Sequence, residues 1–125
     1  MKKIIIFDLD GTLLDTLTDL TNSVNFALSK YSFPLRTKEQ VRQAIGNGVA
    51  KLMERSIPKG TANPHYFACF DEFKKHYAEH YSENTFPYPD MVETVRKLKD
   101  KGYKVAVATN KIDSIAHILI EKHYP

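Results

Sequence analysis

The stretch Ile4-Ile5-Ile6-Phe7-Asp8-Leu9-Asp10-Gly11-Thr12 joins a short apolar run to two acidic residues. An apolar run bounded by turn-forming residues is typical of a buried β-strand. Alternate side chains of an extended chain point the same way, so Asp8 and Asp10 should share one side while Leu9 turns into the core. Two like charges held close together are unfavourable unless a cation or a shared proton relieves them. The stretch therefore predicts a buried strand that ends in a chemically active pair of carboxylates.

The composition is that of a globular protein and excludes several classes of function. The chain has 125 residues, of which 42% are hydrophobic and 26% are charged, enough for one domain with a core. Its formal net charge of +3 is too small to indicate a nucleic-acid partner. No segment is long enough to cross a membrane, and the single cysteine, Cys69, fits a reducing compartment. We therefore expect a cytoplasmic protein that binds neither nucleic acid nor membranes.

The hydrophobic pattern divides the chain into an interrupted α/β core and a helical insertion. Apolar residues recur at helical spacing through residues 16–86, and many of them are aromatic toward the end of this segment. A further helix and a glycine link precede a second predicted strand, Lys104 to Ala108. A helix that leads by a short link into a strand indicates a parallel α/β sheet. We expect residues 1–15 and 87–125 to form a partial core, with residues 16–86 inserted as an all-helical domain.

Two motifs carry a resemblance to a known family. Asp8-Leu9-Asp10-Gly11-Thr12 resembles the first motif of the haloacid dehalogenase superfamily, and Val107-Ala108-Thr109-Asn110-Lys111 resembles the second. The resemblance extends over nearly the whole chain and is closest to the phosphoglycolate phosphatase-like subgroup. It implies an α/β fold with a partial Rossmann-like core of parallel strands, in which the helical insertion is a cap.

The resemblance implies a magnesium-dependent phosphate monoester hydrolase that acts on a small phosphorylated metabolite. Asp8 would be the nucleophile that forms an aspartyl-phosphate, and Asp10 would be the general acid and base. Both would hold Mg²⁺, Asp8 through its carboxylate and Asp10 through its backbone carbonyl. The phosphate would be bound by donors at Gly11, Thr12, Thr109, Asn110 and Lys111. Because an alkoxide leaving group needs a proton and a halide does not, an acid at Asp10 favours ester hydrolysis over dehalogenation.

The resemblance also implies groups that this sequence does not contain. Members of the family carry a later lysine that neutralises the phosphate and one or two acidic residues that complete the magnesium site. Lys111 lies in the second motif and Lys122 on the last predicted helix, so neither is expected to replace that lysine. His123-Tyr124-Pro125 resembles the approach to a further strand. We therefore predict a truncated chain with little phosphatase activity alone, whose exposed sheet edges favour self-association.

Three other functions remain open from the sequence. A sugar phosphomutase of the same superfamily shares both motifs and the helical cap. A non-catalytic binding or interaction fragment built on the cap fits a truncated chain. A receiver domain of a signalling system also uses clustered aspartates and magnesium, but it needs its acceptor aspartate near the middle of the chain. No aspartate occurs between Asp19 and Asp71, which argues against a receiver domain.

Overall fold

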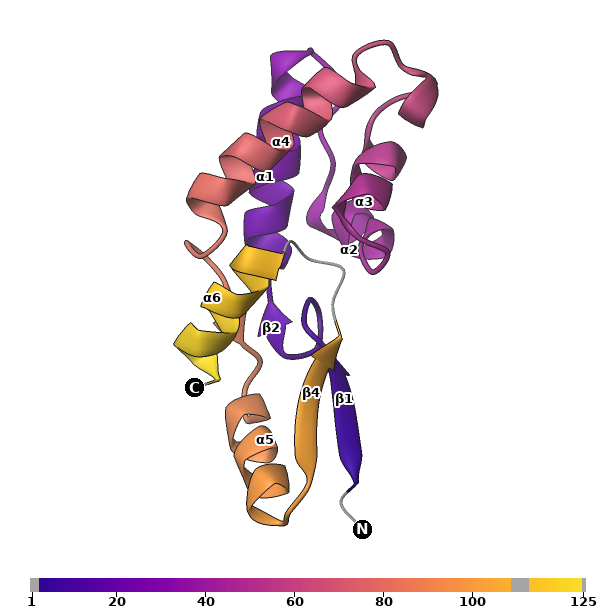
Figure 1. Ribbon diagram of the computed structural model, residues 1–125. Coiled ribbons are helices and arrows are strands. Elements are labelled where there is room, and N and C mark those ends of the chain that lie inside the picture. The colour runs from indigo at the N-terminus through magenta and orange to yellow at the C-terminus, as the bar shows by residue number, and fades with distance from the viewer. Residues whose placement is uncertain (1–2, 109–112, 125) are drawn as a thin grey trace. The chain divides into compact units, whose positions relative to one another are not determined.

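The computed structural model describes residues 3–108 and 113–124 (Figure 1). It divides into two compact units, one made of Met1–Asp15 with Phe86–Pro125 and one made of Thr16–Thr85. We call the first the α/β unit and the second the helical unit. The α/β unit draws on both ends of the chain, whereas the helical unit is one continuous segment. That this segment serves as a cap, with a boundary at residue 86, stays a prediction.

The α/β unit contains the two strands that the sequence predicts. Strand β1 (Ile4–Asp8) pairs in parallel with β4 (Lys104–Ala108), in a register that places Ile4 opposite Lys104 and Asp8 opposite Ala108. Helix α5 (Met91–Asp100) leads into β4, and helix α6 (Asp113–His123) follows it (Figure 1). The predicted α/β class with a parallel sheet is confirmed. Because the strands are parallel, their carboxyl ends lie at the same edge of the sheet.

A second, very short sheet lies where the chain leaves and re-enters the α/β unit. Strand β2 (Leu14–Asp15) pairs antiparallel with β3 (Phe86–Pro87), with Leu14 opposite Pro87 and Asp15 opposite Phe86. The sequence did not predict this pair, because two residues are too few to show an alternating pattern.

The prediction that β1 is buried is wrong for one of its two faces. Ile4 and Ile6 are 63% and 65% exposed, whereas Ile5 and Phe7 on the opposite face are half-buried. Helix α5 packs on β4, and within the described residues the sheet has only these two strands. An apolar strand is buried on both faces only when helices cover both faces of the sheet. The exposed side of β1 and β4, which carries Ile4, Ile6, Lys104 and Ala106, is here called the open sheet face.

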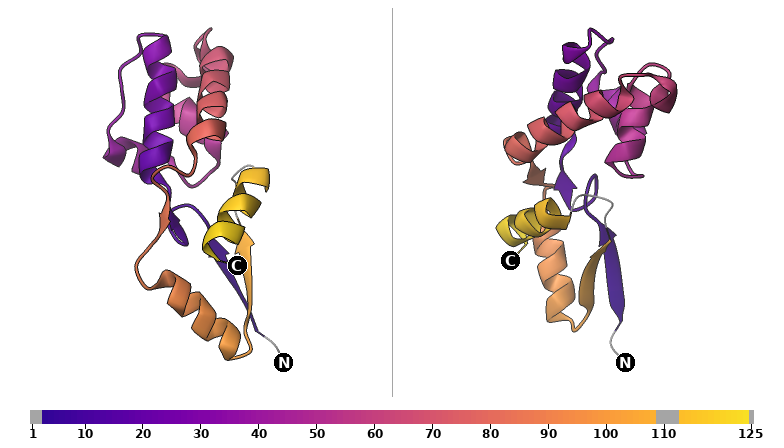
Figure 2. Two further views of the ribbon diagram at one scale, coloured as in Figure 1. Left: turned by 90° about the vertical axis from the view of Figure 1, so that its left-hand side faces the viewer. Right: turned by 45° about the horizontal axis from the view of Figure 1, so that its top comes forward.

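The helical unit contains four α-helices and one short 3₁₀ helix in the described residues. These are α1 (Leu17–Lys30), α2 (Lys38–Ala44), α3 (Val49–Ser56), η1 (Gly60–Ala62) and α4 (Tyr66–His80). Helices α1 and α4 pack along one another, as the two views of Figure 2 also show. Thr37 and Gln40 form a capping box at the start of α2. No helix in the described part of the chain has the length and apolar character that a bilayer span requires.

The core of the helical unit consists of one stripe from each of its two long helices. From α1 it includes Leu20, Val24 and Leu28, none of which is more than 2% exposed. From α4 it includes Phe73 and Tyr77, whose rings stack with centroids 5.7 Å apart. These are the positions at helical spacing that the sequence predicts as core, so the pattern gives the packed faces of both helices correctly.

A buried carboxylate joins the two ends of the helical unit. Asp19, in the first turn of α1, is 1% exposed. Its two oxygens accept the backbone N–H of Asn84 at 3.0 and 2.8 Å, and Oδ2 accepts the hydroxyl of Thr85 at 2.7 Å. We call these three residues the clasp. It holds the segment that enters the helical unit against the segment that leaves it.

The clasp should contribute strongly to stability. We expect Asp19→Ala to lower the free energy of unfolding by about 3 kcal/mol, because it removes a buried charged acceptor that binds the N–H of Asn84 and the buried hydroxyl of Thr85. Asp71→Ala is the matched control, since Asp71 only forms an exposed ion pair with Lys74. It should change the same quantity by less than about 0.5 kcal/mol. Urea unfolding followed by circular dichroism measures both, and equal losses would refute the role of the clasp.

The open sheet face should drive self-association of this chain. Ile6→Lys places a charge on that face and should shift the chain toward monomer in sedimentation velocity, because a charged edge disfavours pairing between sheets. Ile118→Lys is the control, since Ile118 is also exposed, at 49%, but lies on α6. A wild-type chain that sediments as a single monomer at every concentration would contradict this prediction.

Candidate active site

The carboxyl end of β1 continues into a tight turn, residues 9–14, here called the motif turn. The backbone carbonyl of Leu9 accepts the N–H groups of Leu13 at 3.1 Å and Leu14 at 3.0 Å. The carbonyl of Leu14 accepts the N–H of Gly11 at 2.9 Å. The side chains of Leu9, Leu13 and Leu14 are at most 2% exposed. The motif turn is therefore closed by its own backbone and anchored by three leucines.

Gly11 is required by the conformation of the motif turn. Its φ is +80°, a region that residues with a Cβ rarely adopt, while a Cβ built there would meet no atom within 4 Å. The constraint is therefore the backbone angle and not the available space. Its N–H already donates to Leu14, so in this conformation Gly11 shapes the turn and does not present that N–H to a ligand. The N–H of Thr12 is held more weakly, with its nitrogen 3.4 Å from the oxygen of Leu9.

Asp8 and Asp10 lie on either side of a buried leucine. Asp8 is the last residue of β1 and is exposed, Asp10 in the motif turn is half-buried, and Leu9 between them is fully buried. This is the alternation that the sequence predicts. The Oδ1 atom of Asp8 accepts the backbone N–H of Leu9 at 2.8 Å. One oxygen of the Asp8 carboxylate is thus held by the backbone next to it, which restrains the orientation of the other.

Tyr124 supports the motif turn, and the sequence did not predict this contact. Its hydroxyl donates to the carbonyl of Leu13 at 2.7 Å. Burial raises the pKa of Tyr124, so the phenol stays protonated and remains a donor at neutral pH. Helix α6 ends at His123, and the prediction that residues 123–125 approach a further strand stays a prediction. A tyrosine can bury its ring and still satisfy its hydroxyl in this way.

The second motif cannot be placed as fully as the first. Thr109, Asn110 and Lys111 lie outside the described residues. Strand β4, which precedes them in the sequence, ends at Ala108, and Ala108 pairs with Asp8. The carboxyl edge of a parallel sheet is where α/β proteins bind their ligands. The structure therefore brings Asp8, Asp10 and the end of β4 to one edge.

The single cysteine is excluded as a nucleophile by its surroundings. Burial, with a smaller contribution from Glu72, raises the pKa of the Cys69 thiol to about 11. Because the thiolate is the nucleophilic form, Cys69 is inert at neutral pH. Across residues 3–108 and 113–124, no group of three or more His, Cys, Asp or Glu side chains is arranged to hold a metal ion. Among the described residues, no third side chain of these types therefore joins Asp8 and Asp10 in a group that could hold a metal ion.

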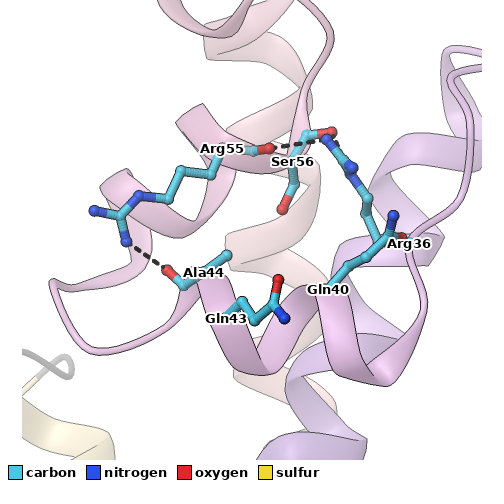
Figure 3. A pocket seen from close by; sticks show the side chains of 6 residues that line it. All are labelled: Arg36, Gln40, Gln43, Ala44, Arg55 and Ser56. Atoms are coloured by element: carbon cyan, nitrogen blue, oxygen red, sulfur yellow. Dashed lines mark hydrogen bonds between the residues drawn. The ribbon is translucent and has the colours of Figure 1, made fainter.

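A cavity of about 300 Å³ in the helical unit is lined by residues that include Arg36 and Arg55, which bind backbone carbonyls at the ends of helices (Figure 3). Arg36 donates to the carbonyls of Arg55 at 2.9 Å and Ser56 at 3.3 Å, and Arg55 donates to the carbonyl of Ala44 at 2.9 Å. The last carbonyls of a helix have no partner within the helix, and basic side chains commonly satisfy them. Arg36 and Arg55 therefore close the carboxyl ends of α2 and α3.

Comparison with known proteins agrees with this architecture. The chain is 38% identical over 116 residues to the phosphoglycolate phosphatase of Haemophilus influenzae (strain 86-028NP), which covers 87% of this chain and 52% of that protein. It is 33% identical over 119 residues to the phosphoglycolate phosphatase of Aquifex aeolicus (strain VF5), with coverages of 95% and 54%. The chain spans about half the length of these curated relatives.

A solved structure and a family model cover nearly all of the chain. The crystal structure of a predicted phosphoglycolate phosphatase from Haemophilus somnus 129PT matches with a TM-score of 0.87 and 32% identity, over 99% of this chain and 58% of that one. The family model described as haloacid dehalogenase-like hydrolase matches residues 5–124. That range contains β1, the motif turn, the helical unit and β4. The chain belongs to the haloacid dehalogenase-like hydrolase family.

Proposed function

We propose that the protein represented by this chain hydrolyses small phosphate monoesters, phosphoglycolate among them, through a phosphoryl group carried on Asp8. The observation that carries the proposal is the exposed Asp8 carboxylate at the carboxyl end of β1, followed by the closed motif turn with Asp10. Membership of the hydrolase family and similarity to proteins named phosphoglycolate phosphatase support the reaction and the substrate class. We expect the reaction to take place in the cytoplasm.

In the first step, a carboxylate oxygen of Asp8 attacks the phosphorus atom and the bond to the leaving oxygen breaks. The leaving alkoxide takes the electron pair of that bond and a proton from the carboxyl group of Asp10. The N–H of Leu9 holds Oδ1 of Asp8, which leaves Oδ2 as the attacking oxygen. Because this hydrogen bond already restrains the Asp8 carboxylate, the carboxylate loses less rotational freedom when it reaches the attacking geometry.

In the second step, water releases the phosphoryl group from Asp8. The carboxylate of Asp10 takes a proton from the water as the water oxygen attacks phosphorus, and the bond between phosphorus and Asp8 breaks. Inorganic phosphate leaves, Asp8 is again a carboxylate, and Asp10 is again protonated. Asp10 is half-buried in the motif turn, whose backbone bonds between Leu9, Gly11 and Leu14 enclose it.

The donor set at the motif turn fits a hard cation. Mg²⁺ binds oxygen ligands, commonly one or two protein carboxylates together with substrate phosphate and water. Asp8 would hold the ion through its carboxylate and Asp10 through its backbone carbonyl, and the bound ion would supply positive charge next to the phosphoryl oxygens. Thr12, Thr109, Asn110 and Lys111 are proposed to donate to the phosphate, while Gly11 maintains the turn.

We propose further that this chain alone is a weak catalyst. Phosphoryl transfer depends on positive charge around the equatorial oxygens, and within the described residues the motif turn offers only two acidic residues to retain a metal ion. Turnover of p-nitrophenyl phosphate with Mg²⁺ should therefore lie well below the roughly 10 s⁻¹ that is typical of enzymes.

Binding of a phosphoryl analogue tests the role of Asp8 without requiring turnover. With MgCl₂ and beryllium fluoride, we expect a ¹⁹F NMR signal from trifluoroberyllate bound to Asp8, because this anion forms a stable adduct with a nucleophilic carboxylate. Asp8→Asn should abolish the signal, since the amide oxygen is a poor ligand for beryllium. Asp100→Asn, at an exposed position in α5, is the control and should retain it.

Two outcomes would overturn the assignment of Asp8. A bound signal that survives in Asp8→Asn would place the acceptor elsewhere. The absence of any bound signal in a folded wild-type chain would favour the alternative of a non-catalytic binding fragment.

A further inference from the structure

Two histidines lie one helical turn apart on α4, away from the motif turn in the sequence and in the other compact unit. His76 and His80 have ring centroids 4.2 Å apart, with an angle of 28° between the ring planes. Residues four apart on a helix are neighbours on one face. Both rings are half-buried, so each is partly open to solvent. The pair is thus close, roughly parallel and accessible.

The Nδ1 atom of each histidine is already bonded to an oxygen. Nδ1 of His76 lies 2.7 Å from Oγ of Ser23, a fully buried residue on α1. Nδ1 of His80 is bonded to the carboxylate of Glu83. No hydrogen bond to either Nε2 atom is found among the described residues, so the Nε2 lone pairs remain for another ligand.

This arrangement is that of metal-binding histidines. Such a histidine donates one ring N–H to a carboxylate, carbonyl or hydroxyl, which fixes its tautomer and leaves the other nitrogen to bind the metal. Nδ1 of His80 has such a contact with the Glu83 carboxylate, and the Ser23 hydroxyl next to Nδ1 of His76 plays the same part when that nitrogen carries the proton. Phe26 also stacks on His76 with centroids 4.4 Å apart, which further restrains the orientation of this ring.

We propose that His76 and His80 form a two-histidine site for a late first-row transition metal ion, with Zn²⁺ as the representative ligand. Bonds from zinc to histidine nitrogen are about 2.0–2.1 Å, so two nitrogens that share one ion lie at most about 4 Å apart. The ring centroids are 4.2 Å apart in a stacked arrangement, so the partly exposed His80 ring must turn out of the stack for both Nε2 atoms to reach one ion. Water would complete the coordination, because the described residues offer no third side chain in place.

The chemistry of this site separates it from the magnesium site proposed at the motif turn. Imidazole nitrogen binds Zn²⁺, Ni²⁺ and Cu²⁺ well, whereas Mg²⁺ prefers oxygen ligands and keeps several waters. The two sites should therefore select different ions. The inference does not depend on the proposed phosphatase function.

The test is calorimetric titration of the full 125-residue chain with ZnCl₂, carried out in an Asp8→Asn background so that the motif turn does not contribute. We expect one equivalent of Zn²⁺ to bind. His80→Gln should abolish this binding, and His117→Gln, on α6, should leave it unchanged. Ser23→Ala should weaken it by roughly tenfold or more, because loss of an outer contact costs 10–100-fold in metal affinity. MgCl₂ in place of ZnCl₂ should give no binding at this site.

A loss of zinc binding in His80→Gln can be distinguished from unfolding of the chain. His80 is the last residue of α4, so its replacement should leave the circular dichroism spectrum unchanged. Nitrogen chemical shifts report directly on the ligand atoms, and the Nε2 resonances of His76 and His80 should move on addition of Zn²⁺. A wild-type chain that binds no Zn²⁺, or a folded His80→Gln chain that binds it equally well, would overturn the proposal.

Discussion

The backbone carbonyl of Leu9 accepts the N–H groups of Leu13 and Leu14, and the geometry of the candidate site depends on this contact. It closes the motif turn immediately after β1, so that Asp8 ends the strand and Asp10 follows within the turn. The three buried leucines fix the turn to the α/β unit, and the hydroxyl of Tyr124, the residue after α6, binds the carbonyl of Leu13. Two carboxylates are thus positioned by backbone bonds and apolar anchors, without a bound ion.

The helical unit is inserted at the end of this same turn and has its own closing interaction. The chain leaves the α/β unit at Asp15 and returns at Phe86, where β2 and β3 pair. Within the helical unit, Asp19 binds Asn84 and Thr85, so that the first and last segments of the insertion are held together. A buried carboxylate is tolerated here because it accepts several hydrogen bonds. Each unit therefore secures its own ends.

Much of the fold could be predicted from the sequence, because the elements concerned carry strong local signals. Strands β1 and β4, the capping box at Thr37 and the buried stripes of α1 and α4 follow from periodicity and from residues that favour caps. The exposure of Ile4 and Ile6 could not be predicted, since the burial of a strand depends on which elements cover it. The burial and the hydrogen bonds of Asp19 could not be predicted either, because an acidic residue in the first turn of a helix is common. At the site, the motif predicts roles for Asp8, Asp10 and Gly11, but the contact of Tyr124 with Leu13 joins residues too distant in sequence for any local pattern.

The central claim is that the motif turn is ordered by its own sequence before any ligand binds. Backbone ¹⁵N relaxation of the ligand-free, metal-free chain tests this most directly. The account predicts order parameters for residues 9–14 near 0.85, the value of rigid backbone, and equal to those of β1. Order parameters below about 0.6 in residues 9–14, with β1 remaining rigid, would contradict it.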